Sequence, residues 1–483
     1  MSETMRSRIE QSQYIAGQWV RPAAGETTTV LSPATGETVS EIGFAGERDA
    51  TDAMDAAEAA FPAWSARPAR ERAAILGQTA ILLRARARAI GHILALESGK
   101  RSAEAEGEVR FAAEYFQWFA EEIRRPCGEM VPGDVPGRHQ MVTHQAAGVA
   151  ISLTPWNFPV SIQARKLAPA LAAGCTVVAR PSQRAPLSVI ELIRCLEDAG
   201  MPAGVVNLII GPAKSTTEAM MHHRALRVVS FTGSTAVGQE LVHLSAKQLP
   251  KLALELGGNA PFIVFADADI EQAIEGALIA KFRNNGQSCI AGNRFYVQDD
   301  VYDEFLSRLG KRLEAMRIGN PLHSADVDLG PVISGANRER LDRLVQDAKD
   351  VGARSIAKAP GVPDTGFYVP PIFLEQVPET SALAKQEVFG PIAPLHRFSE
   401  EEEVIARAND CDMGLAGYVF TRDVGRSFRV TGALECGIIG LNHALPSVAV
   451  APMGGWKKSG LGREGGRAGL EEFLEVKYVS LQI

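Results

Sequence analysis

The chain has 483 residues, of which 46% are hydrophobic and 22% are charged, and its formal net charge is −7. The apolar fraction excludes a mainly disordered chain, and the slightly acidic balance gives no reason to expect binding to nucleic acid or to an anionic membrane. At roughly 100–200 residues per domain, this length favours about three domains. The six cysteines never form a CxxC pair, so neither a disulfide scaffold nor a zinc ribbon is predicted, and we expect a reducing, cytoplasmic location. No apolar stretch is long enough to predict a signal peptide or a membrane span.

The N-terminal third is predicted to be turn-rich and then helical. Residues 1–45 contain only short β-like pieces, such as 27–31. The run 68–99 begins at a proline and ends at a glycine, which is typical of a helix, and 103–123 forms a second one. We expect the aromatic stripe of this second helix to pack in the core. Prolines and glycines cluster at 124–137 and predict a break in the chain.

From residue 148 onward, short apolar strands alternate with helices. The predicted strands are 149–153, 175–179, 205–210, 226–231, 262–265 and 294–297. The predicted helices are 159–173, 187–199, 234–247, 270–282 and 301–316, with a loop at 211–217. This alternation indicates βαβ units and a parallel sheet, whose ligands bind beyond the carboxyl ends of the strands. An apolar tail strand at 474–483 needs a sheet edge in the same chain or in a neighbouring subunit.

One glycine pattern imitates a dinucleotide-binding fingerprint. Gly460, Gly462 and Gly465 match GxGxxG, but no strand precedes them and too little chain follows to complete a βαβ unit. The pattern therefore predicts a glycine-rich turn near the mouth of a site or at a domain junction.

Four polar segments follow predicted strands or helices and carry candidate chemistry. Cys289 lies in a polar, glycine-containing loop that gives a thiolate access and nearby donors, although a lone cysteine is more often a small buried hydrophobe. Glu255 ends a strand beside two glycines and either faces a cleft or is simply solvated. Asn157 follows a strand in a turn with two prolines, and its amide either stabilises a developing oxyanion or caps a helix. Ser234 opens a strand-to-helix turn that suits a pyrophosphate.

Together these segments resemble the NAD(P)-dependent aldehyde dehydrogenase family from about residue 13 to the C-terminus. The matching motifs are TPWNFP at 154–159, FTGS at 231–234, ELGGNAP at 255–261, GQSC at 286–289, EVFGP at 387–391 and SGLGRE at 459–464. The resemblance implies an α/β fold with a Rossmann-type cofactor domain, an α/β catalytic domain and a small β oligomerisation element. The expected boundaries are 1–126 and 147–257 for the cofactor domain, 258–458 for the catalytic domain, and 127–146 with 459–483 for the oligomerisation element and tail. Such proteins form homodimers or homotetramers.

The resemblance also implies a mechanism. Cys289 would attack the aldehyde and form a thiohemiacetal, whose oxyanion is held by the Asn157 side chain and the Cys289 backbone N–H. Hydride transfer would leave a thioester, and Glu255 would activate the water that hydrolyses it. Lys166 and Glu464 match positions that relay protons or order the site. A CoA-acylating enzyme is disfavoured because Glu255 is present.

For the cofactor, the resemblance points to NAD or NADP. The residues assigned to its binding are Thr154, Trp156, Arg180, Ser182, Gln183, Gly233, Ser234, Leu256, Glu387 and Phe389. Relatives usually carry Lys-Pro-x-Glu where this chain has Arg180-Pro181-Ser182-Gln183. Gln183 removes a carboxylate that would repel a 2′-phosphate, and Arg180 adds a guanidinium suited to phosphate. We therefore expect NADP⁺ to be accepted or preferred; the alternative is neutral drift with NAD⁺ use intact.

The substrate class is predicted from residues 281–289 and 460–479, which most resemble succinate-semialdehyde dehydrogenases. In that subgroup Arg165, Arg283 and Ser447 would hold the substrate carboxylate; the alternative for the arginines is surface ion pairing. His443 and Pro446 depart from the subgroup, so another anionic aldehyde is expected as readily as succinate semialdehyde. The competing functions are a broad-specificity dehydrogenase for uncharged aldehydes and, more remotely, a non-catalytic structural protein. No metal site is predicted, because His222 and His223 are adjacent and Asp267 to Asp269 is expected to cap a helix.

Overall fold

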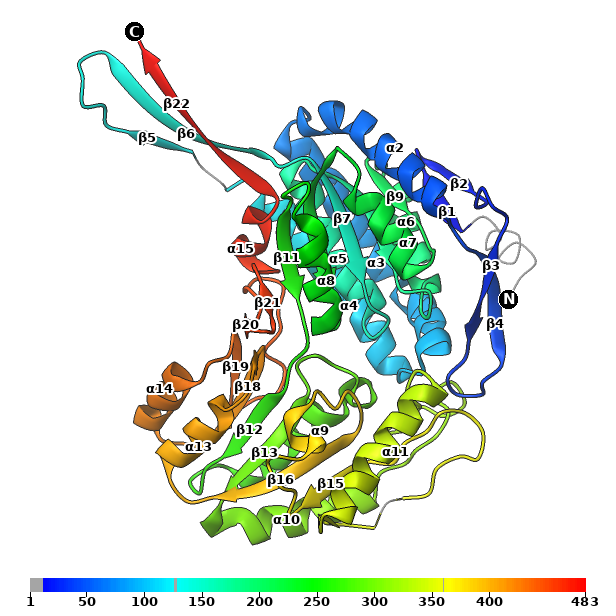
Figure 1. Ribbon diagram of the computed structural model, residues 1–483, viewed down its shortest axis with the longest axis vertical. Helices are drawn as coiled ribbons and strands as arrows, with labels where there is room; N and C mark the ends of the chain where they lie inside the picture. Colours follow the sequence, from blue (N-terminus) through cyan, green and yellow to red (C-terminus); the bar gives the residue numbers. More distant parts are fainter. Residues whose placement is uncertain (1–11, 126–127, 359) are drawn as a thin grey trace.

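The computed structural model describes residues 12–125, 128–358 and 360–483 (Figure 1). Cys127 and the predicted boundary at 126–127 lie outside these residues. An eight-stranded sheet and a seven-stranded sheet lie one beyond the other along the long axis, and a three-stranded ribbon projects from the end of the first sheet. Within the described residues, none of the helices has the length and apolar character needed to cross a membrane.

The first sheet has the strand order β2-β1-β9-β8-β7-β10-β11-β21. Its five central strands are parallel: β9 (Val206–Leu208), β8 (Thr176–Pro181), β7 (Val149–Thr154), β10 (Leu226–Thr232) and β11 (Lys251–Glu255). The antiparallel edges are β1 (Gln13–Ile15) with β2 (Gln18–Val20), and β21 (Gly460–Leu461). The predicted parallel α/β sheet is therefore confirmed, and its central strands are buried as continuous apolar runs require.

Helices cover this sheet. They are α2 (Glu47–Ser65), α3 (Ala69–Ser98), α4 (Ser102–Glu122), α5 (Pro159–Ala173), α6 (Leu187–Asp198), α7 (Ala213–Met221) and α8 (Thr235–Ser245). Proline at its first position and left-handed Gly174 after its end fix the bounds of α5 where the sequence predicts them. The loop expected at 211–217 is wrong, because α7 begins inside it, directly after Pro212. Of the α4 aromatic stripe, Tyr115, Phe116 and Phe119 are fully buried, as expected.

The second sheet has the order β14-β15-β16-β13-β12-β18-β19. Its strands are β12 (Ala260–Val264), β13 (Gly292–Gln298), β14 (Arg354–Ser355), β15 (Ile372–Glu375), β16 (Ile392–Phe398), β18 (Ala416–Phe420) and β19 (Ile438–Leu441), all parallel to their neighbours except β14. Its helices are α9 (Ile270–Phe282), α10 (Asp299–Glu314), α11 (Gly335–Asp350), α12 (Ala382–Lys385), α13 (Glu401–Asn409) and α14 (Val424–Ala433).

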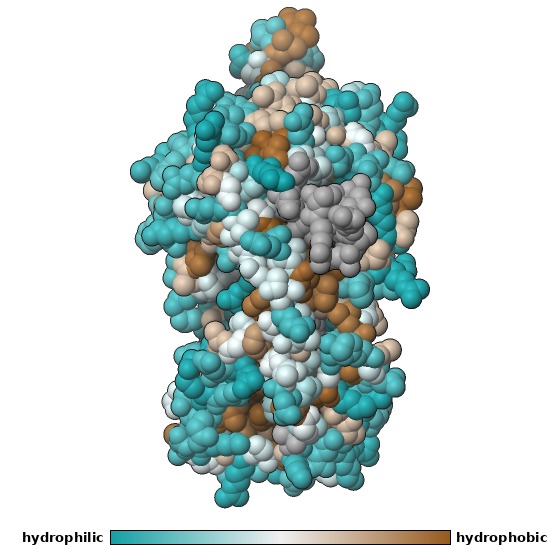
Figure 2. All heavy atoms as spheres, turned by 90° about the vertical axis from the view of Figure 1, so that its right-hand side faces the viewer, coloured by the Kyte–Doolittle hydropathy of each residue, from teal (hydrophilic) through white to brown (hydrophobic). Residues whose placement is uncertain are grey.

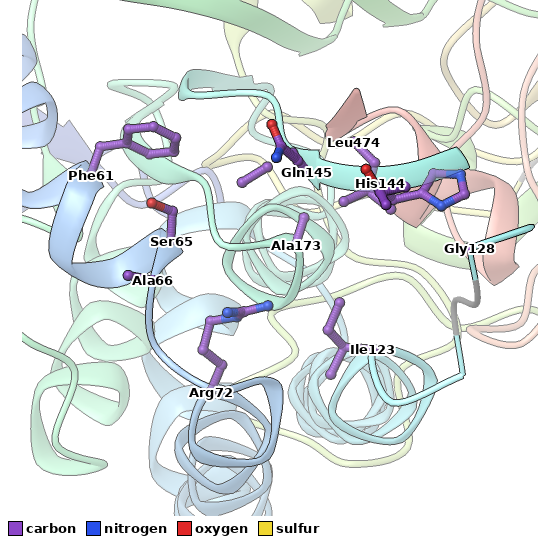
Figure 3. A pocket seen from close by; sticks show the side chains of 12 residues that line it. Phe61, Ser65, Ala66, Arg72, Ile123, Gly128, His144, Gln145, Ala173 and Leu474 are labelled. Atoms are coloured by element: carbon purple, nitrogen blue, oxygen red, sulfur yellow. The ribbon is translucent and has the colours of Figure 1, made fainter. Parts of the chain in front are cut away.

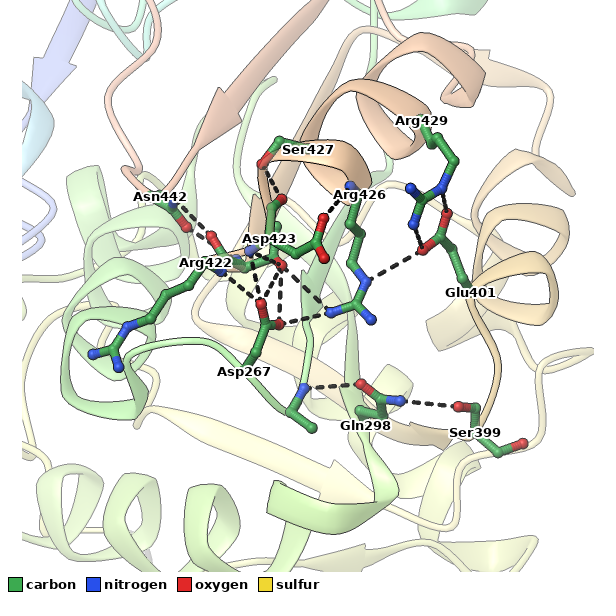
Figure 4. Close-up of polar contacts among 12 residues, drawn as sticks. Asp267, Gln298, Ser399, Glu401, Arg422, Asp423, Arg426, Ser427, Arg429 and Asn442 are labelled. Carbon is green, nitrogen blue, oxygen red and sulfur yellow. Dashed lines mark hydrogen bonds and ion pairs between the residues drawn. The ribbon is translucent and has the colours of Figure 1, made fainter.

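Polar side chains form a network of hydrogen bonds and ion pairs at the carboxyl ends of this second sheet (Figure 4). Asp267, which follows β12, accepts hydrogen bonds from the Thr421 hydroxyl at 2.8 Å and from the backbone N–H groups of residues 422 and 423, and it pairs with Arg426 at 2.7 Å. Asp269 caps α9, as predicted, by accepting from the backbone N–H of Gln272. The carboxylates of Asp267 and Asp269 are thus engaged by neighbouring groups, and the predicted site residue Cys289 lies before β13, at the opposite, amino-terminal edge of this sheet.

The ribbon consists of β5 (Glu129–Val131), β6 (Arg138–Ala146) and β22 (Leu474–Gln482). The tail strand β22 pairs antiparallel with β6 along its whole length, so the predicted strand finds its sheet edge within the same chain. The remaining elements are the hairpin β3 (Thr27–Leu31) with β4 (Thr38–Gly43), the pair β17 (Met413–Gly414) with β20 (Trp456–Lys457), and α15 (Gly466–Glu471).

The glycine pattern near the C-terminus forms a close junction with the first sheet. Gly460 pairs with Glu255 at the end of β11, and a Cβ atom on Gly460 would lie 2.0 Å from the Leu254 carbonyl oxygen. Its φ of +145° is also one that side chains rarely adopt. The pattern is thus a turn beside Glu255 and not a phosphate loop.

Candidate active site

The candidate site lies where the carboxyl ends of the first sheet meet the amino ends of the second. Glu255 ends β11, and Cys289 lies in the short loop that leads into β13. The Cys289 thiol donates a hydrogen bond to Glu255 Oε1 at 2.9 Å, and the Thr232 hydroxyl donates to Oε2 at 3.1 Å. Burial, together with the charge and hydrogen bond of Glu255, raises the pKa of the Cys289 thiol well above its usual range. The thiol is therefore protonated in this arrangement, with a carboxylate in place to take its proton.

Two neighbouring cations on α5 hold the carboxylates of the site. Arg165 Nη2 lies 2.6 Å from Glu255 Oε2, and Arg165 Nε lies 2.7 Å from Glu464 Oε2. Lys166 pairs with the other oxygen of Glu464 and donates to the Ser230 hydroxyl at 3.2 Å. Burial would raise the pKa of Glu464, but the charges of Lys166 and Arg165 outweigh it and lower that pKa. Two buried basic side chains thus face two buried carboxyl groups, although burial, the largest cause, lowers the pKa of Lys166.

Asn157 reaches the nucleophile loop from the turn after β7. Its Nδ2 donates to the backbone carbonyl of Gln287, two residues before Cys289, at 3.2 Å, while its Oδ1 is buried without a partner. Its own carbonyl accepts from Lys100 Nζ at 2.8 Å, and Lys100 forms a buried ion pair with Glu108. The turn that carries the oxyanion candidate is thus held by an ion pair between Lys100, in the loop that joins α3 to α4, and Glu108 on α4.

The candidate cofactor residues near the nucleophile form one cluster. Glu387 accepts from the backbone N–H of Gly258 at 3.2 Å, and burial is the largest cause that raises its pKa to about 7. The rings of Phe389 and Trp156 meet edge to face at 5.5 Å between centroids. Trp156 precedes Asn157 directly, so this aromatic pair connects the second-sheet segment of Glu387 to the oxyanion turn.

The remaining cofactor candidates lie along the first sheet. Arg180 Nη2 donates to the Gly211 carbonyl at 3.0 Å, its Nε is buried without a partner, and burial lowers its pKa to about 10. Ser234 caps α8 and is exposed, next to Gly233, and Gln183 is exposed beyond Ser182. Thr154 and Leu256 are buried instead: Thr154 donates to Gln163 at 2.8 Å, and Leu256 packs against Gly238. An exposed helix N-terminus at Ser234 and a guanidinium at Arg180, each at the carboxyl end of a strand of the first sheet, fit an anionic dinucleotide.

Of the three residues predicted to hold the substrate carboxylate, Arg283 and Ser447 line a cavity, and Arg165 belongs to the buried group of charged side chains. A cavity of about 680 Å³ is lined by Arg283, Ser447 and Phe158, among others, and the Arg283 guanidinium lies 5.0 Å from the Phe158 ring centroid. Among the described residues, no carboxylate pairs with Arg283. Arg165 does not line this cavity; its Nη1 and the Ser447 hydroxyl instead approach the same sulfur of Met453, at 2.7 and 3.6 Å. Arg283 and Ser447 thus line the cavity, whereas Arg165 lies beside Ser447 at Met453, and the role of the three residues in holding the substrate stays a prediction.

Sequence reasoning missed several side chains of the site. The buried Tyr115 lies close to Ser447 and Arg165, which act to lower its pKa although burial raises it, yet at helical spacing its sequence position predicts only a core aromatic. Lys100 and Glu108 are ordinary charged residues in the sequence, and no local pattern marks their burial. Asn284 lies inside the segment 281–289 that carries the family resemblance, but the resemblance assigned it no role. Its place five residues before Cys289 was the one signal that could have marked it.

Comparisons with known proteins agree with this geometry. Residues 19–479 match the model of the aldehyde dehydrogenase family. A glutarate-semialdehyde dehydrogenase of Pseudomonas putida is 43% identical, covering 98% of this chain and 98% of that protein. An NADP(+) succinate-semialdehyde dehydrogenase of Escherichia coli is also 43% identical over 98% of each chain. The crystal structure of a succinate-semialdehyde dehydrogenase from Burkholderia pseudomallei is 41% identical, with a TM-score of 0.96 over 99% of both chains.

Proposed function

This chain belongs to the aldehyde dehydrogenase family, and from that premise we propose that it oxidises an aldehyde bearing a carboxylate or another anionic group, such as succinate or glutarate semialdehyde. It is an NAD(P)-dependent oxidoreductase. The observation that carries the proposal is the hydrogen bond between Cys289 and Glu255, with the Asn157 amide held against the same loop. A non-catalytic protein on this fold has no need of these three groups in contact.

The proposed chemistry uses the site residues in sequence. Glu255 takes the thiol proton, and the Cys289 sulfur attacks the aldehyde carbon to form a thiohemiacetal, with the oxyanion held by Asn157 Nδ2 and the Cys289 backbone N–H. Bound NAD⁺ or NADP⁺ supplies the hydride acceptor. Collapse of the thiohemiacetal leaves a thioester on Cys289. Glu255 first gives up the thiol proton and, as a carboxylate again, deprotonates the attacking water; C–S cleavage then releases the acid, and the departing thiolate takes a proton back from Glu255. Glu464 and Lys166 are proposed to carry the surplus proton away.

The proposed cofactor contacts are those candidate residues of the site whose side chains are at least partly exposed. We assign Glu387 and Phe389 to the nicotinamide end and the Ser234 turn to the pyrophosphate. Gln183 is exposed beside Arg180, which supports acceptance of a 2′-phosphate. Gln183→Glu should therefore lower kcat/KM for NADP⁺ while leaving that for NAD⁺ within about three-fold. A wild-type enzyme that uses NAD⁺ alone would refute the assignment.

We assign the anionic end of the substrate to Arg283 and Ser447 in the cavity. Arg283 is the available cation there, whereas Arg165 is already engaged by Glu255 and Glu464. Arg283→Ala should raise KM for succinate semialdehyde by about 10²-fold, and KM for butanal by less than three-fold, because loss of a charge-assisted hydrogen bond costs on the order of 3 kcal/mol. Cys289→Ala should abolish NAD(P)H formation with both. A broad-specificity enzyme for uncharged aldehydes would instead show equal effects of Arg283→Ala on the two substrates.

We further propose that the chain assembles as a homodimer or homotetramer through its ribbon. The proposed domains are the cofactor domain at 1–126 and 147–257, the catalytic domain at 258–458, and the oligomerisation element with the tail at 127–146 and 459–483. Val476 and Tyr478 of β22 are 67% and 57% exposed, Ile483 directly after this strand is 84% exposed, and the projecting tip in Figure 2 includes hydrophobic residues. A second cavity, of about 670 Å³, opens at the root of the ribbon beside Arg72 (Figure 3). Exposed apolar strands of this kind favour association. Val476→Lys with Tyr478→Lys should lower the mass measured by light scattering; an unchanged mass refutes this route of assembly.

A further inference from the structure

We propose that Asn284 is a positioning residue for thiohemiacetal formation, which sets the Asn157 amide relative to the Cys289 thiol. The inference rests on the proposed function, in which Asn157 stabilises the oxyanion. It concerns a residue three positions before Gln287 that touches neither the aldehyde nor the cofactor in the proposed mechanism, and that acts through two backbone carbonyls.

The Asn284 amide binds both loops of the proposed oxyanion site. Its Nδ2 donates to the Asn157 carbonyl at 2.9 Å and to the Gln287 carbonyl at 3.0 Å. The Gln287 carbonyl also accepts from Asn157 Nδ2 at 3.2 Å. One donor thus draws together the carbonyl of the oxyanion residue and the carbonyl that orients its side chain. Removing the Asn284 side chain therefore leaves the Asn157–Gln287 hydrogen bond without the donor that joins the two loops.

The backbone at Asn284 is built around this side chain. Asn284 and Asn285 have φ values of 52° and 58°, in the left-handed region that few residues other than glycine and asparagine adopt. Gly286 continues the turn at φ 75°, and a Cβ atom there would lie 2.2 Å from the Gly390 carbonyl oxygen. Strain of this kind persists only where surrounding contacts over-determine it. Both asparagines are at least 98% buried, so each holds its conformation through its own hydrogen bonds.

Asn285 provides a matched control. It shares the left-handed backbone and the burial of Asn284, but its amide points elsewhere: Nδ2 donates to the Pro331 carbonyl at 2.9 Å, and Oδ1 accepts from the Gly330 N–H at 2.7 Å. Asn284→Gly and Asn285→Gly therefore both relieve the same backbone strain and both remove one buried amide. They differ in whether the lost amide braces the oxyanion site.

A second contact of the Asn157 carbonyl explains why removing the Asn284 side chain should displace the Asn157 turn and not unfold it. Lys100 Nζ donates to it at 2.8 Å and lies 4.0 Å from the Phe158 ring centroid, so the turn keeps one anchor when Asn284 is removed. A shift of a few tenths of an ångström is enough to matter, since catalytic groups misplaced by about 1 Å lose on the order of 10²-fold in rate.

The test measures single-turnover NAD(P)H formation and, separately, alkylation of Cys289 by iodoacetamide, in the full-length enzyme. Asn284→Gly and Asn284→Asp should slow the single turnover by about 10- to 100-fold with KM changed by less than about three-fold. Asn285→Gly should stay within about three-fold of wild type. Alkylation should stay within about three-fold in every variant, because displacement of iodide at a CH₂ group forms no oxyanion. Asn284→Asp keeps the side-chain volume, so the test survives if the glycine variant unfolds.

Two results would overturn the inference. One is equal kinetics for Asn284→Gly and Asn285→Gly; the other is alkylation that falls in step with turnover, which would mean that the loop itself has loosened. Asn157→Ala separates this failure from that of the proposed function. If Asn157→Ala leaves the single-turnover rate unchanged, the oxyanion assignment is wrong; if it lowers the rate while Asn284→Gly does not, only the positioning role of Asn284 is wrong.

Discussion

Glu387 carries the sharpest pH dependence that we expect of this enzyme. Burial, the largest cause, and the nearby charge of Glu255 raise its pKa from 4.5 to about 7, although the Gly258 N–H opposes the shift. The folded protein thus binds a proton at Glu387 more tightly than the unfolded chain does. Stability falls as the pH rises from about 4.5 to 7, and the ionised carboxylate then costs on the order of 3 kcal/mol. Glu387→Gln should therefore be more stable than wild type at pH 8, with the difference vanishing near pH 5.

The same shift predicts the pH dependence of cofactor binding. If the ionised carboxylate accepts the ribose hydroxyls, a pKa of about 7 makes the dissociation constant roughly ten-fold larger at pH 6 than at pH 8. Glu387→Gln removes the titrating group, so its dissociation constant should be weak and nearly flat over this range. NADH is the probe of choice, because the 2′-phosphate of NADPH titrates near pH 6.

Fluorescence titration with NADH at pH 6, 7 and 8 measures the affinity, and thermal unfolding without cofactor measures the stability. Glu379→Gln is the control, since it is the same chemical change in the segment that leads to Glu387, but at a carboxylate that pairs with Arg407 at 2.5 Å. A wild-type affinity that is flat from pH 6 to 8, or a Glu387→Gln variant less stable than wild type at pH 8, would refute the reasoning.

Two other changes test separate parts of the molecule. Glu255→Gln should slow the burst of NAD(P)H formation, because the Cys289 thiol loses its proton acceptor, and should lower steady-state kcat by about 10²- to 10⁴-fold, because hydrolysis of the thioester also lacks its base. Quenched-flow kinetics that show an unchanged burst rate and an unchanged steady-state rate would contradict this. Asp267→Asn should cost about 1 kcal/mol of unfolding free energy at pH 7. Burial acts to raise the pKa of Asp267, but the hydrogen bonds from Thr421 and from the backbone before α14, together with the charge of Arg426, outweigh burial and lower it (Figure 4). The stabilisation by ionised Asp267 is present above the pKa of this residue in the unfolded chain and is lost as the pH falls through its pKa in the folded protein. Urea titrations should therefore give the same difference in unfolding free energy between wild type and Asp267→Asn from pH 5 to 8. A difference that varies within this range would contradict the prediction.

Much of the fold followed from local chemistry. The bounds of α5 were predictable because Pro159 starts the helix and Gly174 ends it, and the strand β7 was predictable because it is an unbroken apolar run. The helix α7 was not, because its sequence AKSTTEAMM mixes hydroxyl and charged residues and is held by packing against α2 and α8. Propensity is a weak guide where tertiary contacts decide.

The site divides in the same way. Cys289, Glu255 and Asn157 could be foreseen because each ends a recognisable strand or loop and parallel strands converge at one edge. The partners of Arg165 could not, since Glu464 lies about three hundred positions away and Tyr115 lies on another helix. Pairing over such separations depends on the register of β21 against β11 and leaves no periodic trace in the sequence.

That long-range pairing also changes how the two arginines are to be understood. Because Arg165 bridges Glu255 and Glu464, its charge is balanced before any substrate arrives, and removing it would leave two buried carboxylates with Lys166 alone. Its loss should therefore impair neutral and anionic aldehydes alike. Arg283 has no carboxylate partner among the described residues and lies in the cavity, so its charge remains available to the substrate. We therefore expect discrimination between the substrates to depend on Arg283, and Arg165 to hold the Glu255 and Glu464 carboxyl groups in place beside the Cys289 thiol.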